Sequence, residues 1–372
     1  MAGGRLTGRA GGFEVGLLNM RTERAQGLPG ESFTVARIRR NLPGGLEVGG
    51  LFANRDGVGG GEDYFNRSYG ADVNLSVGPA LRIHSYLAAT DYPEVSGNNR
   101  AGRVSVAYRD QLWDVSALYR EIGDAFDPGL GFVARRGIKH SYGTVGVHPR
   151  PNLPGVYEVN PYLEVHYITN LESSLETREG TAGFGVVFSD GGLLRTQFSD
   201  RFEAIEEAFP VAGQGEIPTG RYDFKDASLS YTSSAARPLS GEVRVSGGGF
   251  YNGDRTSVTL AGQWRPNRYF AVDLQAQRNE ISLPGDRFTA DVFGTRLDFA
   301  GSRHLFLSSF IQYNTASEEV VTNVRFNFIH SPLSDLFLVF SERRDVSGGG
   351  SREGGAVLER GLTLKATKLF SF

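Results

Sequence analysis

The amino-acid sequence predicts an all-β fold: a large transmembrane antiparallel up-and-down β-barrel of about 20–22 strands, with short periplasmic turns and longer extracellular loops. Three observations support this prediction. Apolar and polar side chains alternate in segment after segment, glycine-rich turns separate these segments, and the longest apolar runs are short. We therefore expect residues 1–372 to form a single β-barrel domain in the bacterial outer membrane.

The alternation is clearest in segments 69–77, 157–167, 270–277 and 320–328. Within 157–167, for example, the odd positions are mostly apolar and the even positions mostly polar. Consecutive strand residues point to opposite faces, so each segment has one apolar face and one charged or amide face. A polar face repeated in many strands suits a water-filled lumen, whereas soluble sandwiches bury their inward face and have shorter strands.

The turns follow the same arrangement, because short connections alternate with long ones. The short turns lie at 10–12, 42–45, 78–79, 109–110, 190–192, 265–267 and 300–302. The longer connections lie at about 21–31, 55–63, 91–99, 122–137, 203–219 and 344–355. Segment 202–209 is also compatible with one or two helical turns. Short turns on one rim and long loops on the other are typical of outer-membrane barrels.

The segments number about 21, whereas bacterial single-chain barrels normally have an even number of strands. The first residues also lack the apolar region of a signal peptide. We therefore expect a mature or truncated chain that lacks at least one upstream strand. The expected last strand carries aromatic residues at its end that suit an interfacial girdle, and Lys368 interrupts its apolar face and is expected to snorkel towards headgroups. That face comprises Leu362, Leu364, Ala366, Lys368, Phe370 and Phe372.

Composition excludes several other classes. The longest apolar runs contain about five residues, as at 336–340, whereas a membrane helix needs about 20. The chain has 50 Gly and no Cys, so a disulfide framework and a thiolate metal site are both excluded. Its formal net charge of -3 gives no electrostatic case for nucleic acid as a partner.

Charged residues on the polar faces are the candidate lumen-facing residues. They are Arg37, Arg39, Asp72, Arg103, Arg109, Glu158, Glu164, Asp273 and Arg325. The four arginines of the first half have two interpretations. They form a basic patch that favours anionic solutes, or they pair with Asp72, Asp114 or Glu164 across neighbouring strands. We favour pairing, because lumen charges commonly pair.

No motif predicts an enzyme, a cofactor or a metal site. The six histidines include no H-E-x-x-H, and the chain has no G-x-S-x-G elbow and no P-loop. Segment 129–134 resembles a dinucleotide fingerprint but lacks the helix that must follow it. Acidic residues in the loops lack EF-hand spacing. Glu158 and Glu164 lie roughly 20 Å apart along one strand, farther than the carboxylates of a glycosidase.

Several short stretches resemble a group of outer-membrane barrels of unassigned function. They are GRLTG at 4–8, DPGLGFVAR at 127–135, IPTGRY at 217–222, LPGDRF at 283–288, FIQYN at 310–314, TNVRF at 322–326 and SPLSD at 331–335. The stretches cover nearly the whole chain in the family's order. Phe328 or Ile329 stands where the family has Trp, and Lys368 stands where it has an aromatic residue. The resemblance implies an N-terminal carbohydrate-binding module of the family-nine type, which this sequence does not contain.

Two functions are compatible with these features. Barrels above about 16 strands enclose a channel or a plugged lumen. We expect a pore that is open, occluded by its own loops at 122–137 and 203–219, or filled by the missing upstream domain. The first hypothesis is a porin-like conduit for a carbohydrate or another solute, with outer-membrane lipid as its surroundings. The alternative is a membrane anchor that holds the N-terminal carbohydrate-binding module at the cell surface.

Overall fold

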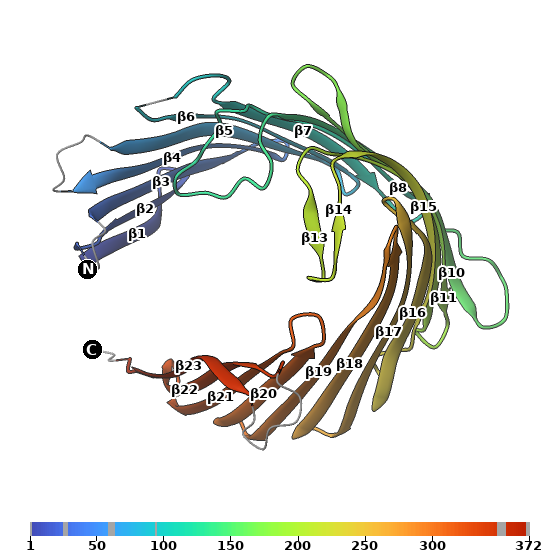
Figure 1. Cartoon of the computed structure of the whole chain (residues 1–372). Coiled ribbons are helices and arrows are strands. Elements are labelled where there is room, and N and C mark those ends of the chain that lie inside the picture. Colours follow the sequence, from blue (N-terminus) through green and yellow to red (C-terminus); the bar gives the residue numbers. More distant parts are fainter. Residues whose placement is uncertain (1, 25–28, 59–63, 94, 348–354, 370–372) are drawn as a thin grey trace. The chain divides into compact units, whose positions relative to one another are not determined.

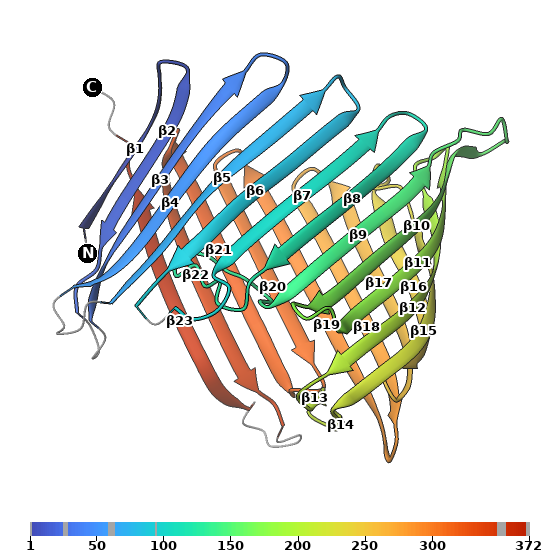
Figure 2. The same ribbon diagram turned by 90° about the horizontal axis from the view of Figure 1, so that it is seen from above.

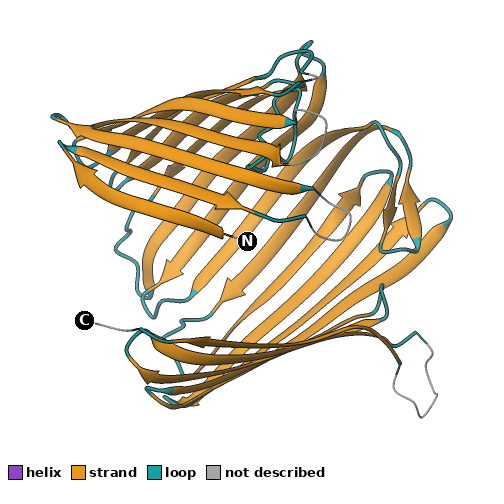
Figure 3. Cartoon of the chain, turned by 90° about the vertical axis from the view of Figure 1, so that its left-hand side faces the viewer, coloured by secondary structure: helices purple, strands orange, loops and turns teal. Residues whose placement is uncertain are grey.

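Alternating side chains and glycine turns build this chain into consecutive antiparallel strands. The computed structural model describes residues 2–24, 29–58, 64–93, 95–347 and 355–369. Over these residues there are 23 strands and no helix. Figure 3 shows the strands in orange. None of the described residues belongs to a helix that is able to cross a membrane. Phe370 and Phe372, which we expected at the end of the last strand, lie outside the described residues.

The chain divides into two compact units. Unit 1 contains the described residues up to His148 together with Tyr162–Gly180, and unit 2 contains Pro149–Pro161 and the residues from Thr181 onwards. The strands that lie wholly within unit 1 are β1 (Ala2–Ala10), β2 (Phe13–Arg21), β3 (Gly30–Leu42), β4 (Leu46–Val58), β5 (Phe65–Val77), β6 (Leu81–Asp91), β7 (Arg100–Arg109), β8 (Trp113–Ile122) and β9 (Ile138–Val147).

Two strands contribute residues to both units, namely β10 (Val156–Asn170) and β11 (Leu175–Phe188). The strands of unit 2 are β12 (Leu193–Ile205), β13 (Phe209–Val211), β14 (Gly215–Ile217), β15 (Gly220–Thr232), β16 (Leu239–Phe250), β17 (Gly253–Asn267), β18 (Phe270–Leu283), β19 (Asp286–Ser302), β20 (Leu305–Asn314), β21 (Glu319–Ser331), β22 (Ser334–Asp345) and β23 (Ala356–Thr367).

Consecutive strands pair antiparallel within each unit, in an up-and-down order that can be followed in Figure 2. Twenty-one of the described strands belong to this arrangement, and β13 and β14 form a separate hairpin. The count confirms the predicted range. Glycine makes the tightest turns possible: Gly11 and Gly12 have φ values of 58° and 81°, and Gly44 and Gly45 have values of 81° and 78°. Residues other than Gly, Asn and Asp rarely adopt such φ values in succession.

The register gives each unit one polar and one apolar face, because directly paired residues lie on the same face. In unit 1, Arg39 pairs with Glu14 across β2 and β3, whereas the neighbouring Ile38 pairs with Val15 on the other face. The apolar face is exposed, as Leu87 (74% exposed) illustrates. In unit 2, Leu274 is 55% exposed on the apolar face. Exposed apolar faces of this kind suit contact with lipid.

Burial is concentrated where two connections pack on the polar faces. In unit 1 the connection 123–137 places Phe126 against Ala101, Ile122 and Ile138. This loop follows β8 in the chain and is coloured teal-green in Figure 1. In unit 2 a second core of four buried side chains joins the hairpin β13–β14 to strands β18 and β19. It consists of Ile217, Ile281, Leu283 and Phe288.

Two details of the sequence prediction are wrong. Segment 202–209 forms no helical turn, because β12 continues to Ile205 by pairing with β15, and β13 begins at Phe209. Cross-strand pairing outweighs the local helical preference of its alanine and glutamates. The predicted turns at 265–267 and 300–302 lie later in the chain, because β17 extends through Asn267 and β19 through Ser302.

Candidate functional site

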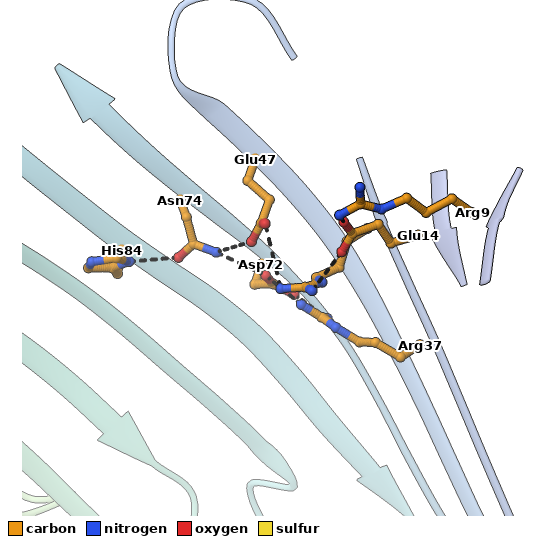
Figure 4. A network of polar contacts seen from close by, with 8 residues as sticks. Arg9, Glu14, Arg37, Glu47, Asp72, Asn74 and His84 are labelled. Carbon is orange, nitrogen blue, oxygen red and sulfur yellow. Dashed lines mark hydrogen bonds and ion pairs between the residues drawn. The ribbon is translucent and has the colours of Figure 1, made fainter. Parts of the chain in front are cut away.

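A network of charged and amide side chains covers the polar face of strands β1 to β6 in unit 1 (Figure 4). The two carboxylate oxygens of Glu14 form ion pairs, one with Arg9 at 2.5 Å and the other with Arg39 at 2.7 Å. Arg37 binds Asp72 with two parallel hydrogen bonds of 2.5 and 2.9 Å. Such bidentate pairs are the strongest class of charge-assisted hydrogen bond in proteins.

Asn74 links the two ends of this network. Its amide nitrogen donates to Glu47 at 3.0 Å and to Asp72 at 3.3 Å. Its amide oxygen lies 2.8 Å from Nδ1 of His84, on the next strand. Arg39 also lies 3.6 Å from Glu47. Every carboxylate of the network therefore has at least one cationic or amide partner.

Gly49 allows the Arg37–Asp72 pair to form. Arg37 belongs to β3 and Asp72 to β5, so their side chains meet above the intervening strand β4. A Cβ at Gly49 would lie 2.7 Å from Nη2 of Arg37 and 2.8 Å from Oδ2 of Asp72. The missing side chain therefore provides the space in which this pair is made.

A second group of polar contacts lies on the polar face of β8, β9 and β10. Nη2 of Arg120 lies 3.2 Å from Nδ1 of His140, and Nε2 of His140 lies 3.2 Å from Nδ1 of His166. Nε2 of His166 lies 3.5 Å from Glu164, which also accepts a 3.0 Å hydrogen bond from the Tyr142 hydroxyl. The two imidazole rings are stacked with their centroids 5.4 Å apart.

The donors assign the tautomers of both histidines. A guanidinium cannot accept a hydrogen bond, so Nδ1 of His140 accepts from Arg120 and its Nε2 carries the proton. This proton is donated to Nδ1 of His166, whose own Nε2–H then points to Glu164. One directed chain of polar contacts thus runs from Arg120 through His140 and His166 to Glu164.

Polar side chains also fasten the connection 123–137 to the polar face. Asn66 is 5% exposed and donates to the carbonyl oxygen of Asp127 at 2.9 Å. Its own oxygen accepts from the backbone N–H of Gly129 at 2.8 Å. Thr90 is fully buried, and its hydroxyl accepts from the backbone N–H of Asp127 at 3.1 Å. Tyr92 donates to the carbonyl oxygen of Ala125 at 3.0 Å.

The hairpin β13–β14 is fastened by aromatic rings in unit 2. The ring of Tyr251 lies 5.6 Å from those of Phe209 and Tyr222, 5.3 Å from Phe224 and 4.9 Å from Phe250. Tyr251 occupies the turn between β16 and β17 with a φ of 53°. Burial and the negative charge of Glu203 raise the pKa of this tyrosine. It is therefore a neutral hydroxyl at physiological pH.

The arginines that the sequence singled out differ in their partners. Arg37 pairs with Asp72, and Arg109 lies 2.9 Å from Asp114, as the pairing interpretation expects. Arg39 pairs instead with glutamates that we had not named. Arg103 has no carboxylate partner among the described residues, and its guanidinium donates a 3.4 Å hydrogen bond to the Ser105 hydroxyl.

The remaining candidates lie in three places. Glu164 belongs to the histidine chain, and Glu158 lies 3.1 Å from Arg150. In unit 2, Asp273 accepts from Gln263 at 2.5 Å. Arg325 lies opposite Ser308 of β20 on the same polar face. The interpretation of all these residues as lumen-facing stays a prediction.

Sequence reasoning missed several members of these groups. Glu14, Glu47 and Asn74 alternate with apolar residues and were detectable by the same period of two. His140 and His166 belong to no sequence motif, and their contact depends on the register of β9 against β10. Lys368 was expected to snorkel, and its Nζ lies 2.9 Å from Nε2 of His330. Within the described part of the chain, no group of three or more His, Asp or Glu side chains is arranged to hold a metal ion.

Comparison with known proteins identifies the fold. The siderophore receptor PirA from Acinetobacter baumannii superimposes with a TM-score of 0.54 at 10% identity, over 95% of this chain and 72% of PirA. The ferric yersiniabactin uptake receptor FyuA from Yersinia pestis gives 0.44 at 12% identity, over 98% and 75% of the two chains. The ferric-catecholate import receptor Fiu from E. coli K12 gives 0.38 at 8% identity, over 95% and 71%.

No family model and no curated protein matches the chain. The fold class therefore rests on the strands and on the likeness to PirA. It is the antiparallel up-and-down β-barrel of the bacterial outer membrane, and the protein belongs in that membrane. The resemblance to barrels with a carbohydrate-binding module stays an expectation.

Proposed function

We propose that this protein is a conduit for solute passage across the outer membrane, with its polar faces lining a water-filled interior. The observation that carries this proposal is the polar network from Arg9 to His84. The exposed apolar face of these strands suits lipid. The opposite face of the same six strands carries paired charges and amides, which require a polar environment. Lipid on that second face would cost about 2–4 kcal/mol for each central Arg or Lys.

The two inward connections support a narrowed conduit rather than an open one. The loop 123–137 and the hairpin β13–β14 each pack on the polar face of their own unit. The sequence is compatible with three states of the pore, namely an open pore, occlusion by these loops and an upstream plug. The buried contacts of Phe126 and Ile217 favour a pore that the chain's own loops narrow without closing it.

The likeness to PirA is compatible with solute uptake, because PirA is a siderophore receptor. An identity of 10% does not transfer the solute. We therefore propose passage of a carbohydrate or another polar solute, without assigning a siderophore.

Conductance in a planar bilayer tests the proposal. Purified protein that migrates faster unheated than heated on a gel is folded, and such protein should give discrete current steps. The unfolded, heated sample is the control. Folded protein that inserts into the bilayer and passes no current would contradict the conduit.

A further inference from the structure

One row of directly opposed residues crosses the polar face of unit 1. It runs through the register of eight consecutive strands, from β2 to β9. The row consists of Glu14, Arg39, Gly49, Asp72, Tyr86, Arg103, Arg120 and His140. Its first half belongs to the neutralised network around Asp72. Its second half, beyond Tyr86, carries two guanidiniums and no carboxylate.

Arg103 and Arg120 face each other directly across β7 and β8. Opposed residues of an antiparallel pair have Cα atoms about 4.5–5.5 Å apart, and like charges at this position are destabilising. Neither arginine has an ion pair with any residue that the structure describes. By contrast, Arg37, Arg39 and Arg109 on the same face are all neutralised by carboxylates.

The hydrogen-bonding groups around the pair leave donors unused. Nε of Arg120 is shielded from solvent and has no partner in the described part of the chain. The Arg103 guanidinium has only the weak contact with Ser105. His140 uses its single acceptor atom, Nδ1, in the contact with Arg120. An imidazole also brings no negative charge to the site. The site therefore has positive charge and an unused donor, and no carboxylate of the described residues forms an ion pair with either guanidinium.

The pair lies directly beneath the inward loop. Ala101 and Ile122 are the next residues on the same face of β7 and β8, and both are buried under Phe126 of the loop. A solute that passes the loop 123–137 meets the two arginines at that level of the wall.

We propose that Arg103 and Arg120 form a binding site for the oxyanion group of a solute, either a carboxylate or a phosphate. Two guanidiniums side by side present several N–H donors to one oxyanion and relieve their mutual repulsion by binding it. The site's role in transport rests on the proposed conduit function, but binding itself does not. Tyr86, on the other side of Arg103, separates the site from the negative charge of Asp72.

Isothermal titration of the folded chain in detergent tests this site. The probes are inorganic phosphate and citrate, and the variants are Arg103→Gln, Arg120→Gln and the double variant. We expect wild type to bind at least one probe, each single variant to bind at least fivefold more weakly, and the double variant to show no binding. The probe that binds distinguishes a phosphate-bearing from a carboxylate-bearing solute.

Arg109→Gln is the matched control, because it removes the same charge from the same face of β7 at a site neutralised by Asp114. Its affinity should stay within twofold of wild type. Absence of binding by folded wild type, or equal binding by the double variant, would overturn the proposal. If the protein conducts current but binds neither probe, the conduit stands and the proposed site is refuted. If it binds a probe but conducts no current, the site stands and the conduit is refuted.

Discussion

Gly129 donates its backbone N–H to the side-chain oxygen of Asn66 at 2.8 Å, although the two residues are 63 positions apart. The same amide group of Asn66 donates to the carbonyl oxygen of Asp127 at 2.9 Å. One buried side chain thus satisfies two backbone groups of a connection that carries no strand of its own. Irregular backbone packed on a strand face needs such partners, because unpaired buried polar groups are costly.

The first prediction concerns this attachment. Asn66→Ala removes both hydrogen bonds and leaves the N–H of Gly129 without its acceptor. This change should lower the free energy of local opening of the loop by about 1–3 kcal/mol. We expect hydrogen exchange of the amides in 123–137 to speed up roughly tenfold or more. Exchange followed by mass spectrometry on the folded protein measures this.

Asn19→Ala is the control, because Asn19 is exposed and, among the described residues, its side chain bonds only to the Thr34 hydroxyl. It should leave exchange in 123–137 unchanged. If Asn66→Ala also leaves it unchanged, the loop is held by Phe126 and Thr90 rather than by Asn66.

A second prediction concerns the hairpin β13–β14. Ile217 is fully buried among Ile281, Leu283 and Phe288. Ile217→Ala therefore leaves a cavity, which should destabilise the packed hairpin by about 2–5 kcal/mol. The hairpin should detach from the polar face, and a protease should cut within 206–219 faster than in wild type. Leu229→Ala, on the apolar face with 53% exposure, is the comparison and should not accelerate this cleavage. Equal cleavage rates in all three proteins would show that Ile217 does not hold the hairpin.

The sequence was sufficient to predict the strands, their number and the two faces, because the period of two is a local property of each segment. It also identified both inward connections as candidates for occlusion. The anchors Asn66 and Thr90 were not predictable, since their partners lie in a loop far along the chain. The Arg37–Asp72 pair was one of several possible pairings, and only the register showed that it crosses β4 above Gly49.

A third prediction separates pairing from mere proximity in that contact. Arg37→Gln leaves Asp72 without its cation, and Asp72→Asn leaves Arg37 without its anion. Because both side chains are partly exposed (32% and 19%), each single change should cost only about 1 kcal/mol of unfolding free energy. The double variant should recover part of this loss. Urea unfolding in detergent gives the coupling through a double-mutant cycle, and a coupling of zero would show that the pair contributes nothing.

The same variants have opposite effects on ion selectivity if the polar face lines the conduit. Arg37→Gln should shift the reversal potential towards cations, Asp72→Asn should shift it towards anions, and the double variant should resemble wild type. Identical reversal potentials in all four proteins would place this pair outside the conduction path.

The last prediction concerns pH and the turn between β7 and β8. The backbone N–H groups of Trp113 and Leu112 donate to Asp110 at 2.7 and 2.8 Å, and the Tyr108 hydroxyl donates at 2.8 Å. These bonds hold the pKa of Asp110 below its ordinary value. A carboxylate with a lowered folded pKa stabilises the fold above its unfolded pKa of about 4, and this contribution is lost as the pH falls through the folded pKa. Asp110→Asn should therefore lower the unfolding midpoint at pH 7 and have little effect near pH 2, whereas Glu207→Gln, in a loop, should have little effect at either pH. An equal loss at both pH values would trace the effect of Asp110→Asn to packing rather than to ionisation.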